Sequence, residues 1–220
     1  MRKHRQNPPG HHTALIADTL GRGPRLPAAE RRQAILDTAC RVFAERSYRG
    51  ATTAEIARAA GVTEPVLYRH FPSKTDLYLA CLEDVWQGLR AAADEAVERT
   101  GEPRVAMKVV AEEYMNPEKR VHLVDLWIQS LSEAADEPRI RDYLKRQMRE
   151  VHDYFADGLR GWQATGGLKS DRDADAEAWI FIAGGLLRTI DRRLGGLLGD
   201  DIERVKRERM RWLCGEDAAS

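Results

Sequence analysis

Residues 51–82 restrict the possible folds of this chain more than any other segment, because they predict two short helices joined by a glycine turn. Thr53 offers an N-cap hydroxyl to a first helix of strong helix formers, and Gly61 ends that helix where a left-handed backbone is needed. Thr63 can cap a second helix, which carries Pro65 in its first turn. The apolar positions that can seal the two helices together are Ile56, Ala60, Val62, Leu67 and Phe71. This set predicts a helix-turn-helix.

A helix-turn-helix reads DNA with the first residues of its second helix, while nearby hydroxyl and basic groups hold phosphates. The residues expected to face the major groove are Glu64, Pro65, Val66, Tyr68 and His70, and those suited to phosphates are Thr53, Tyr68, His70 and Lys74. Glu64 could accept a hydrogen bond from cytosine, and Pro65 or Val66 could contact a thymine methyl. The alternative for each residue alone is structural: Glu64 favours a helix N-terminus, Tyr68 packs on the surface and His70 is solvated.

Several short sequences in and around the motif follow a recognisable pattern, and the last of those given next is the most specific. They are a helix over residues 32–46, Tyr48-Arg49-Gly50-Ala51-Thr52-Thr53, the turn Gly61-Val62-Thr63 and, above all, Leu67-Tyr68-Arg69-His70-Phe71-Pro72-Ser73-Lys74. Together they resemble the DNA-binding domain of the tetracycline-repressor (TetR) family, over about residues 30–82. The resemblance implies that Thr53, Glu64, Pro65, Val66, Tyr68, His70 and Lys74 contact DNA, and that a helical ligand-binding domain follows. The long segment before residue 28 departs from the family's pattern.

The composition is that of an ordinary globular protein, with 220 residues of which 43% are hydrophobic. The longest strongly apolar run, residues 178–187, is far shorter than the roughly 20 residues of a membrane span, and the N-terminus does not resemble a signal peptide. We therefore expect a cytoplasmic protein without a membrane partner. Cys40, Cys81 and Cys214 are widely spaced, which argues against a disulfide framework and a zinc site; the first two fit core positions.

The zero net charge of the whole chain hides an asymmetry between its two parts. Residues 1–75 contain 13 Lys and Arg against 6 Asp and Glu, a charge of +7 that leaves −7 for the remainder. A basic N-terminal third suits a polyanion such as DNA. Part of this excess lies in residues 1–27, which are rich in Pro and Gly and are expected to form a disordered basic arm, either a soluble tail or a minor-groove contact.

Helical spacing recurs through the rest of the chain, so the predicted fold class is all-α. Helices are expected at residues 28–46, 75–99, 104–115, 118–135, 138–165, 174–195 and 201–214, besides the two of the motif. The predicted domains are a three-helix DNA-binding domain at 28–75, a larger helical ligand-binding and dimerisation domain at 76–215, and a tail at 216–220. The helix from Thr75 to about Arg99 would connect the two domains.

The larger domain carries large apolar side chains and a helix that is apolar on all sides. The candidate pocket residues are Trp86, Met115, Trp127, Met148, Phe155 and Trp179, although such residues are more often core. His122, Asp125, Gln129 and His152 could orient a ligand or be ordinary polar positions. The family resemblance implies that the last two long helices pair with a second copy; candidate interface residues are Ala183, Gly184, Leu187, Ile190, Leu194 and Val205. The alternative is a monomer core.

The expected function is that of a homodimeric repressor that binds a pseudo-palindromic double-stranded DNA operator and releases it when a small molecule occupies the larger domain. The chain contains no His-Glu-x-x-His, Gly-Lys-Ser/Thr loop, Gly-x-Ser-x-Gly or Cys/His ligand cluster, so no catalytic, metal or cofactor site is expected. Two alternatives stay open. One is an architectural or activating factor whose larger domain only oligomerises, and the other is a helical enzyme or carrier.

Overall fold

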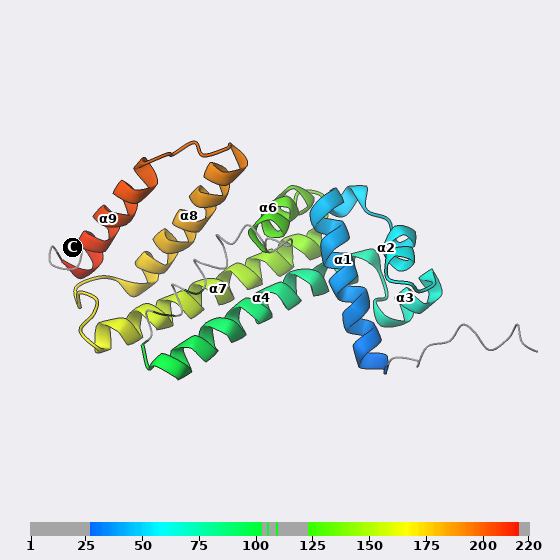
Figure 1. The fold of residues 1–220 in the computed structure, drawn as a ribbon, viewed down its shortest axis with the longest axis horizontal. Coiled ribbons are helices and arrows are strands. Elements are labelled where there is room, and N and C mark those ends of the chain that lie inside the picture. Colours follow the sequence, from blue (N-terminus) through cyan, green and yellow to red (C-terminus); the bar gives the residue numbers. More distant parts are fainter. Residues whose placement is uncertain (1–26, 103–104, 106–108, 110–122, 216–220) are drawn as a thin grey trace, which may run out of the picture.

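A computed structural model of the chain describes residues 27–102, 105, 109 and 123–215, and this part is helical and contains no strand. Its helices are α1 (Ala28–Gly50), α2 (Thr53–Ala59), α3 (Glu64–His70), α4 (Lys74–Thr100), α6 (Leu123–Glu133), α7 (Pro138–Ala164), α8 (Ala174–Arg193) and α9 (Asp201–Cys214). Figure 1 shows α1, α2 and α3 at one end, the long helices α4 and α7 through the middle, and α8 with α9 at the other end. The predicted all-α fold is confirmed.

Most predicted helix limits lie within two residues of those observed, because caps and glycines mark them in the sequence. The first helix is an exception: it continues to Gly50 through a break at Ser47, whose backbone φ is +63°. Only glycine adopts that conformation readily, so the sequence offered no sign of it. The predicted helix at 104–115 falls almost entirely outside the described residues, as do the basic arm and the C-terminal tail.

The motif is held together by its turn and by a capping box. Gly61 has a φ of +67°, as predicted for the residue that ends α2. The N-cap of α2 is Thr52 and not Thr53: the Thr52 hydroxyl accepts from the Glu55 amide, and the Glu55 carboxylate accepts from the Thr52 amide. That prediction was wrong because Glu55 stands three residues after Thr52, the spacing that a capping box requires.

One hydrophobic core joins the motif to the larger domain. Phe43 of α1 is fully buried, and its ring meets Tyr78 of α4 edge-on at 4.9 Å. The same cluster continues through Leu126 of α6 into Ile140 and Leu144 of α7. No gap in packing therefore marks the predicted boundary near residue 75, and α4 belongs to the core on both sides of it.

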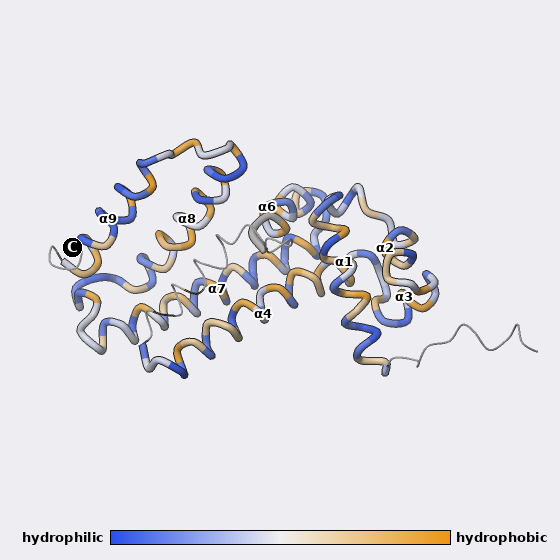
Figure 2. The backbone as a smooth tube through the Cα atoms, viewed as in Figure 1, coloured by the Kyte–Doolittle hydropathy of each residue, from blue (hydrophilic) through white to orange (hydrophobic). Residues whose placement is uncertain are grey.

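A second core lies at the far end of the molecule, between α4, α7 and α8. Trp86 is 2% exposed and packs edge-on against Tyr154 at 5.9 Å, with Phe155 and Leu159 beside it. Figure 2 shows hydrophobic residues recurring along α4 and α7, as this arrangement requires. None of the helices in the described ranges is long and apolar enough to cross a bilayer.

Charged contacts fasten the first domain to the corner between α6 and α7. Arg49, just beyond the break at Ser47, donates from Nε to Glu133 at 2.8 Å and also pairs with Asp136. Asp76, in the first turn of α4, accepts from Arg139 at 2.5 Å and from the Ser73 hydroxyl at 2.6 Å. The corner thus touches both the end of α1 and the start of α4.

Asp76 gives this corner a measurable dependence on pH. The hydrogen bond from Ser73, and then that from Arg139, lower the pKa of the Asp76 carboxyl below its usual value. The stability that it contributes is therefore present at neutral pH and lost as pH falls through about 4 and below. Asp76→Asn should lower the free energy of unfolding by about 0.5 to 1 kcal/mol at pH 7, with the difference from wild type shrinking in acid.

Urea unfolding at a series of pH values measures this difference directly. Asp142→Asn is the matched control, because Asp142 lies exposed on α7 and no hydrogen bond or ion pair to it is observed among the described residues. A constant difference between Asp76→Asn and wild type down to the lowest pH would contradict the assignment.

Candidate nucleic-acid interface

Three polar side chains form a continuous hydrogen-bonded chain between α2 and α3. The Thr53 hydroxyl donates to Glu64 Oε1 at 2.7 Å and lies 3.0 Å from the Tyr68 hydroxyl. Because an ionised carboxylate only accepts, the single proton of Thr53 goes to Glu64, and Tyr68 must donate to Thr53. Thr53, Glu64 and Tyr68, all predicted DNA contacts, are therefore hydrogen-bonded to one another, and the hydroxyl proton of Tyr68 is donated to Thr53.

The inner face of α3 is buried, and the outer face carries the predicted reading residues. Leu67 is fully buried, whereas Pro65 is exposed and Tyr68 is 42% exposed. Val66 and His70, one turn apart, are half-buried. This arrangement leaves the first turn of α3 accessible, which is the part that such motifs place against base edges.

Lys74 stands apart from α3, at the start of α4. Its ammonium lies 4.6 Å from the centre of the Tyr48 ring, and burial lowers its pKa, while the charge of Glu133 opposes that shift. The Tyr48 hydroxyl in turn lies 3.0 Å from Thr75 Oγ1. A cation beside a helix N-terminus suits a phosphate contact.

One exposed cation on the same surface was missed by the sequence reasoning. Arg69 lies one helical turn after Pro65 on the outer side of α3 and is exposed. The sequence does signal this position, because residues four apart, such as Pro65 and Arg69, lie on the same face of a helix. An arginine at this position can hold a phosphate.

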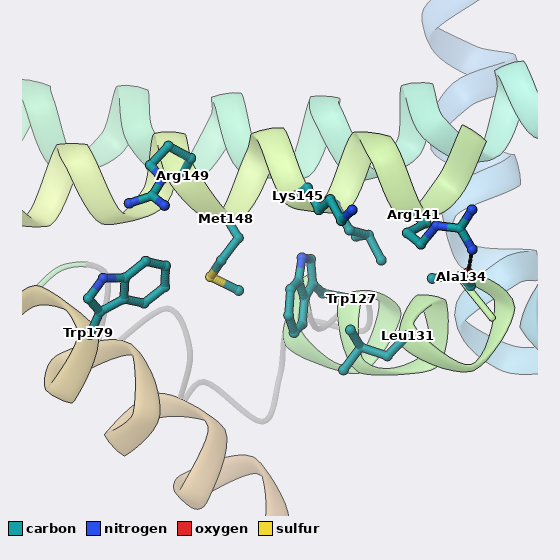
Figure 3. Close-up of a pocket in the computed structure, with 9 residues that line it drawn as sticks. Trp127, Leu131, Ala134, Arg141, Lys145, Met148, Arg149 and Trp179 are labelled. Carbon is teal, nitrogen blue, oxygen red and sulfur yellow. Dashed lines mark hydrogen bonds between the residues drawn. The ribbon is translucent and has the colours of Figure 1, made fainter. Parts of the chain in front are cut away.

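A pocket of about 370 Å³ lies between α6, α7 and α8 (Figure 3). Its walls are Trp127, Leu131, Ala134, Arg141, Leu144, Lys145, Met148, Arg149 and Trp179. Three predicted ligand residues, Trp127, Met148 and Trp179, lie together here. Trp86 and Phe155 instead pack in the second core, where neighbouring side chains cover them. Met115 lies outside the described residues.

Two of the four polar residues suggested as ligand-orienting groups make hydrogen bonds within the protein. His152 is buried; its Nδ1 lies 2.8 Å from the Asp153 carboxylate and its Nε2 3.1 Å from the Asp175 carbonyl. Gln129 donates to the Ala44 carbonyl at 3.4 Å. His122 and the side chain of Asp125 lie outside the described part. No group of three or more potential metal ligands occurs in the described ranges.

The outer face of α8 is apolar and uncovered in a single copy. Ile190 is 47% exposed and Leu194 64% exposed, and Val205 on α9 is 48% exposed. Ala183 and Gly184 are exposed, while Leu187 is half-buried. The sequence predicts that α8 is covered on all sides, but in a single copy one side of it is exposed to solvent.

Comparison with known proteins identifies the N-terminal motif. Residues 35–81 match the bacterial regulatory proteins of the tetR family. The HTH-type transcriptional activator FasR of Mycolicibacterium smegmatis is 41% identical over 95 residues, which are 43% of this chain and 43% of FasR. The nucleoid occlusion factor SlmA of Haemophilus ducreyi is 28% identical over 96 residues, 43% of this chain and 48% of SlmA. The chain therefore matches less than half the length of either relative.

The similarity of fold extends well beyond the motif. A protein of Saccharomonospora viridis, solved in complex with choline, is 25% identical and superposes with a TM-score of 0.65. The superposition covers 82% of this chain and 94% of that one. The similarity of architecture therefore includes the larger helical domain.

Substitutions on this surface should separate base reading from phosphate binding. Arg69→Gln or Lys74→Ala should weaken binding to every DNA sequence and reduce the slope of log affinity against log salt by about 1. Glu64→Gln should instead change the base preferred at a particular position. Selection from a random DNA library, followed by fluorescence anisotropy at several salt concentrations, measures both effects.

Arg99→Gln, at the distant end of α4, is the control and should match wild type. An unchanged selected sequence in Glu64→Gln, together with unchanged salt slopes in the two cation variants, would place the DNA elsewhere.

Proposed function

Because this chain belongs to the tetR family of bacterial regulatory proteins, we propose that it is a homodimeric repressor that releases its operator when a small molecule fills the pocket. The DNA contacts in this proposal are Thr53, Glu64, Pro65, Val66, Tyr68, His70 and Lys74, with Arg69 added. The proposal keeps the two domains expected from the sequence, a DNA-binding domain at 28–75 and a ligand-binding and dimerisation domain at 76–215. The observation that carries the proposal is the position of the pocket directly beside the contacts that fasten the DNA-binding end.

The pocket walls and the domain contacts alternate along the same short stretch of chain. Leu131 and Ala134 line the pocket, and Glu133 between them accepts from Arg49. At the start of α7, Arg141 lines the pocket and Arg139 pairs with Asp76. A ligand that displaces these walls must therefore also disturb the end of α1 and the start of α4.

The energetic requirement for such a switch is modest. A ligand shifts the equilibrium only if it binds the DNA-incompetent arrangement more tightly than the competent one. A coupling of about 1 to 3 kcal/mol changes operator affinity by roughly 5- to 150-fold. The similar protein of Saccharomonospora viridis, solved with choline, supports a small molecule as the effector class.

A second copy is proposed to cover the bare face of α8. A helix-turn-helix dimer reads two half-sites about 34 to 36 Å apart, which gives dimerisation a direct purpose. The face formed by Ala183, Gly184, Leu187, Ile190 and Leu194, with Val205 of α9, offers apolar area and close backbone approach. These residues are the proposed interface.

Activation is the second candidate, because FasR is a transcriptional activator. In that case the protein would bind the same operator but increase transcription of the gene behind it. A reporter gene placed behind the selected operator distinguishes the two, since deletion of a repressor raises expression and deletion of an activator lowers it.

The switch can be tested with the operator selected from a random library. Compounds that raise the melting temperature of the protein should also weaken operator binding, and Arg49→Gln should reduce that weakening by cutting the contact to Glu133. Arg99→Gln should leave it unchanged. A stabilising compound that has no effect on operator affinity would overturn the ligand-responsive part.

The dimer can be tested by placing a charge on the bare face. Ile190→Glu should sediment as a monomer and lose about a hundredfold or more in affinity for a two-half-site operator, because linked binding of the half-sites is lost. Ala91→Glu, exposed on α4, is the control and should behave as wild type. A dimer that persists in Ile190→Glu would move the interface elsewhere.

A further inference from the structure

Three cationic side chains line one wall of the pocket in a single row. Arg141, Lys145 and Arg149 recur every four residues and so share one side of α7. Figure 3 shows all three on the helix above the cavity. Like charges at this spacing repel one another, so the row is unfavourable unless something opposite in charge meets it.

The protein itself supplies no carboxylate to this row among the residues that the structure describes. Two other arginines of α7 are paired with carboxylates: Arg139 meets Asp76 at 2.5 Å, and Arg160 meets Asp157 at 2.8 Å. By contrast, the hydrogen bond that Arg141 makes within the described ranges goes to a carbonyl, that of Ala134, at 3.4 Å. Among the residues with described side chains, those that line the pocket include no Asp or Glu.

The rest of the pocket wall is largely apolar. Trp127 and Leu131 of α6 and Met148 of α7 face the cavity, and Leu131 and Trp179 are 47% and 40% exposed. The cavity volume of about 370 Å³ is within the range of small-molecule sites. A ligand that satisfies both sides needs an apolar body and a charged end.

The aromatic rings do not make this a site for a cation. The guanidinium of Arg149 already lies 5.5 Å from the centre of the Trp179 ring, and the His152 ring stacks on the same tryptophan with the ring centres 4.5 Å apart. A ligand cation would compete with Arg149 for the ring and face repulsion from Lys145. The positive charge of the side chains that line the pocket therefore favours an anionic ligand.

We propose that the pocket binds an amphiphilic anion. A carboxylate or phosphate head is held by Arg141, Lys145 and Arg149, and the apolar body lies against Trp127, Met148 and Trp179. Guanidinium and ammonium groups form the strongest hydrogen bonds with such heads. This inference rests on the proposed role of the pocket as the effector site, and it names the chemical class of the effector.

Binding to the purified full-length protein without DNA tests the class directly. The probes are decanoate and decyl phosphate, with decanol and decyltrimethylammonium as matched ligands of neutral and opposite charge, all below their micelle concentrations. Calorimetry should give binding of at least one anion, about tenfold or more tighter than decanol, and no binding of the cation. The tighter of the two anions identifies the head group. Equal binding of decanol or the cation would overturn the proposal.

Charge removal on α7 tests the placement of the head. The double variant Lys145→Gln, Arg149→Gln should weaken binding of the anion by about tenfold or more, with a melting temperature no lower than that of wild type, because both side chains are exposed and the repulsion within the row is relieved. Arg146→Gln, exposed on the same helix and outside the pocket, should bind as wild type. Full affinity in the double variant would overturn the assignment of the head.

Failure of this inference can be distinguished from failure of the proposed function. If a neutral or cationic compound releases the operator and neither anion binds, the ligand class is wrong and the switch stands. If an anion binds with the predicted charge dependence but leaves the operator bound, the ligand class is supported and the switch fails.

Discussion

The structure depends on the burial of Phe43 against Tyr78, because this contact makes the DNA-binding end and the larger domain parts of one core. Aromatic pairs in this edge-on geometry contribute about 0.5 to 1.5 kcal/mol beyond the area that they bury. Tyr78 also reaches α6, where its hydroxyl donates to the Leu126 carbonyl at 3.3 Å. A single residue of α4 thus touches the helix before the motif and a helix of the pocket. The two ends of the molecule cannot move as fully independent units.

Most of the helical fold could be predicted because its signals are local. Gly61, Gly166-Gly167 and Pro138 mark helix ends in the sequence itself, and the observed α7 and α9 begin where the spacing predicts. The break at Ser47 could not be predicted, since a positive φ at serine is imposed by surrounding contacts. The contacts of Arg49 with Glu133 and Asp136 are equally remote in sequence, 84 and 87 residues apart.

The DNA-binding surface could be predicted in more detail than the pocket, because its signals are local in sequence and those of the pocket are not. The predicted DNA-binding surface lies within one short motif, so residue order nearly determines its geometry. The hydrogen bonds that link Tyr68 to Glu64 through Thr53 depend on side-chain positions that residue order does not give. The pocket draws on three helices, and a stripe of large side chains does not reveal which side it faces. Trp86 and Trp179 look alike in the sequence, yet one is 2% and the other 40% exposed. Tertiary packing alone separates a core tryptophan from one at a pocket.

The bare face of α8 has a consequence for the response of the protein to its own abundance. If two copies must meet there before both half-sites can be held, the population competent for tight binding rises with the square of chain concentration while most chains are single. Occupancy of the DNA would then change over a narrower range of expression than for a regulator that binds alone. The number of molecules per cell, and not only the presence of a ligand, would set whether the site is filled.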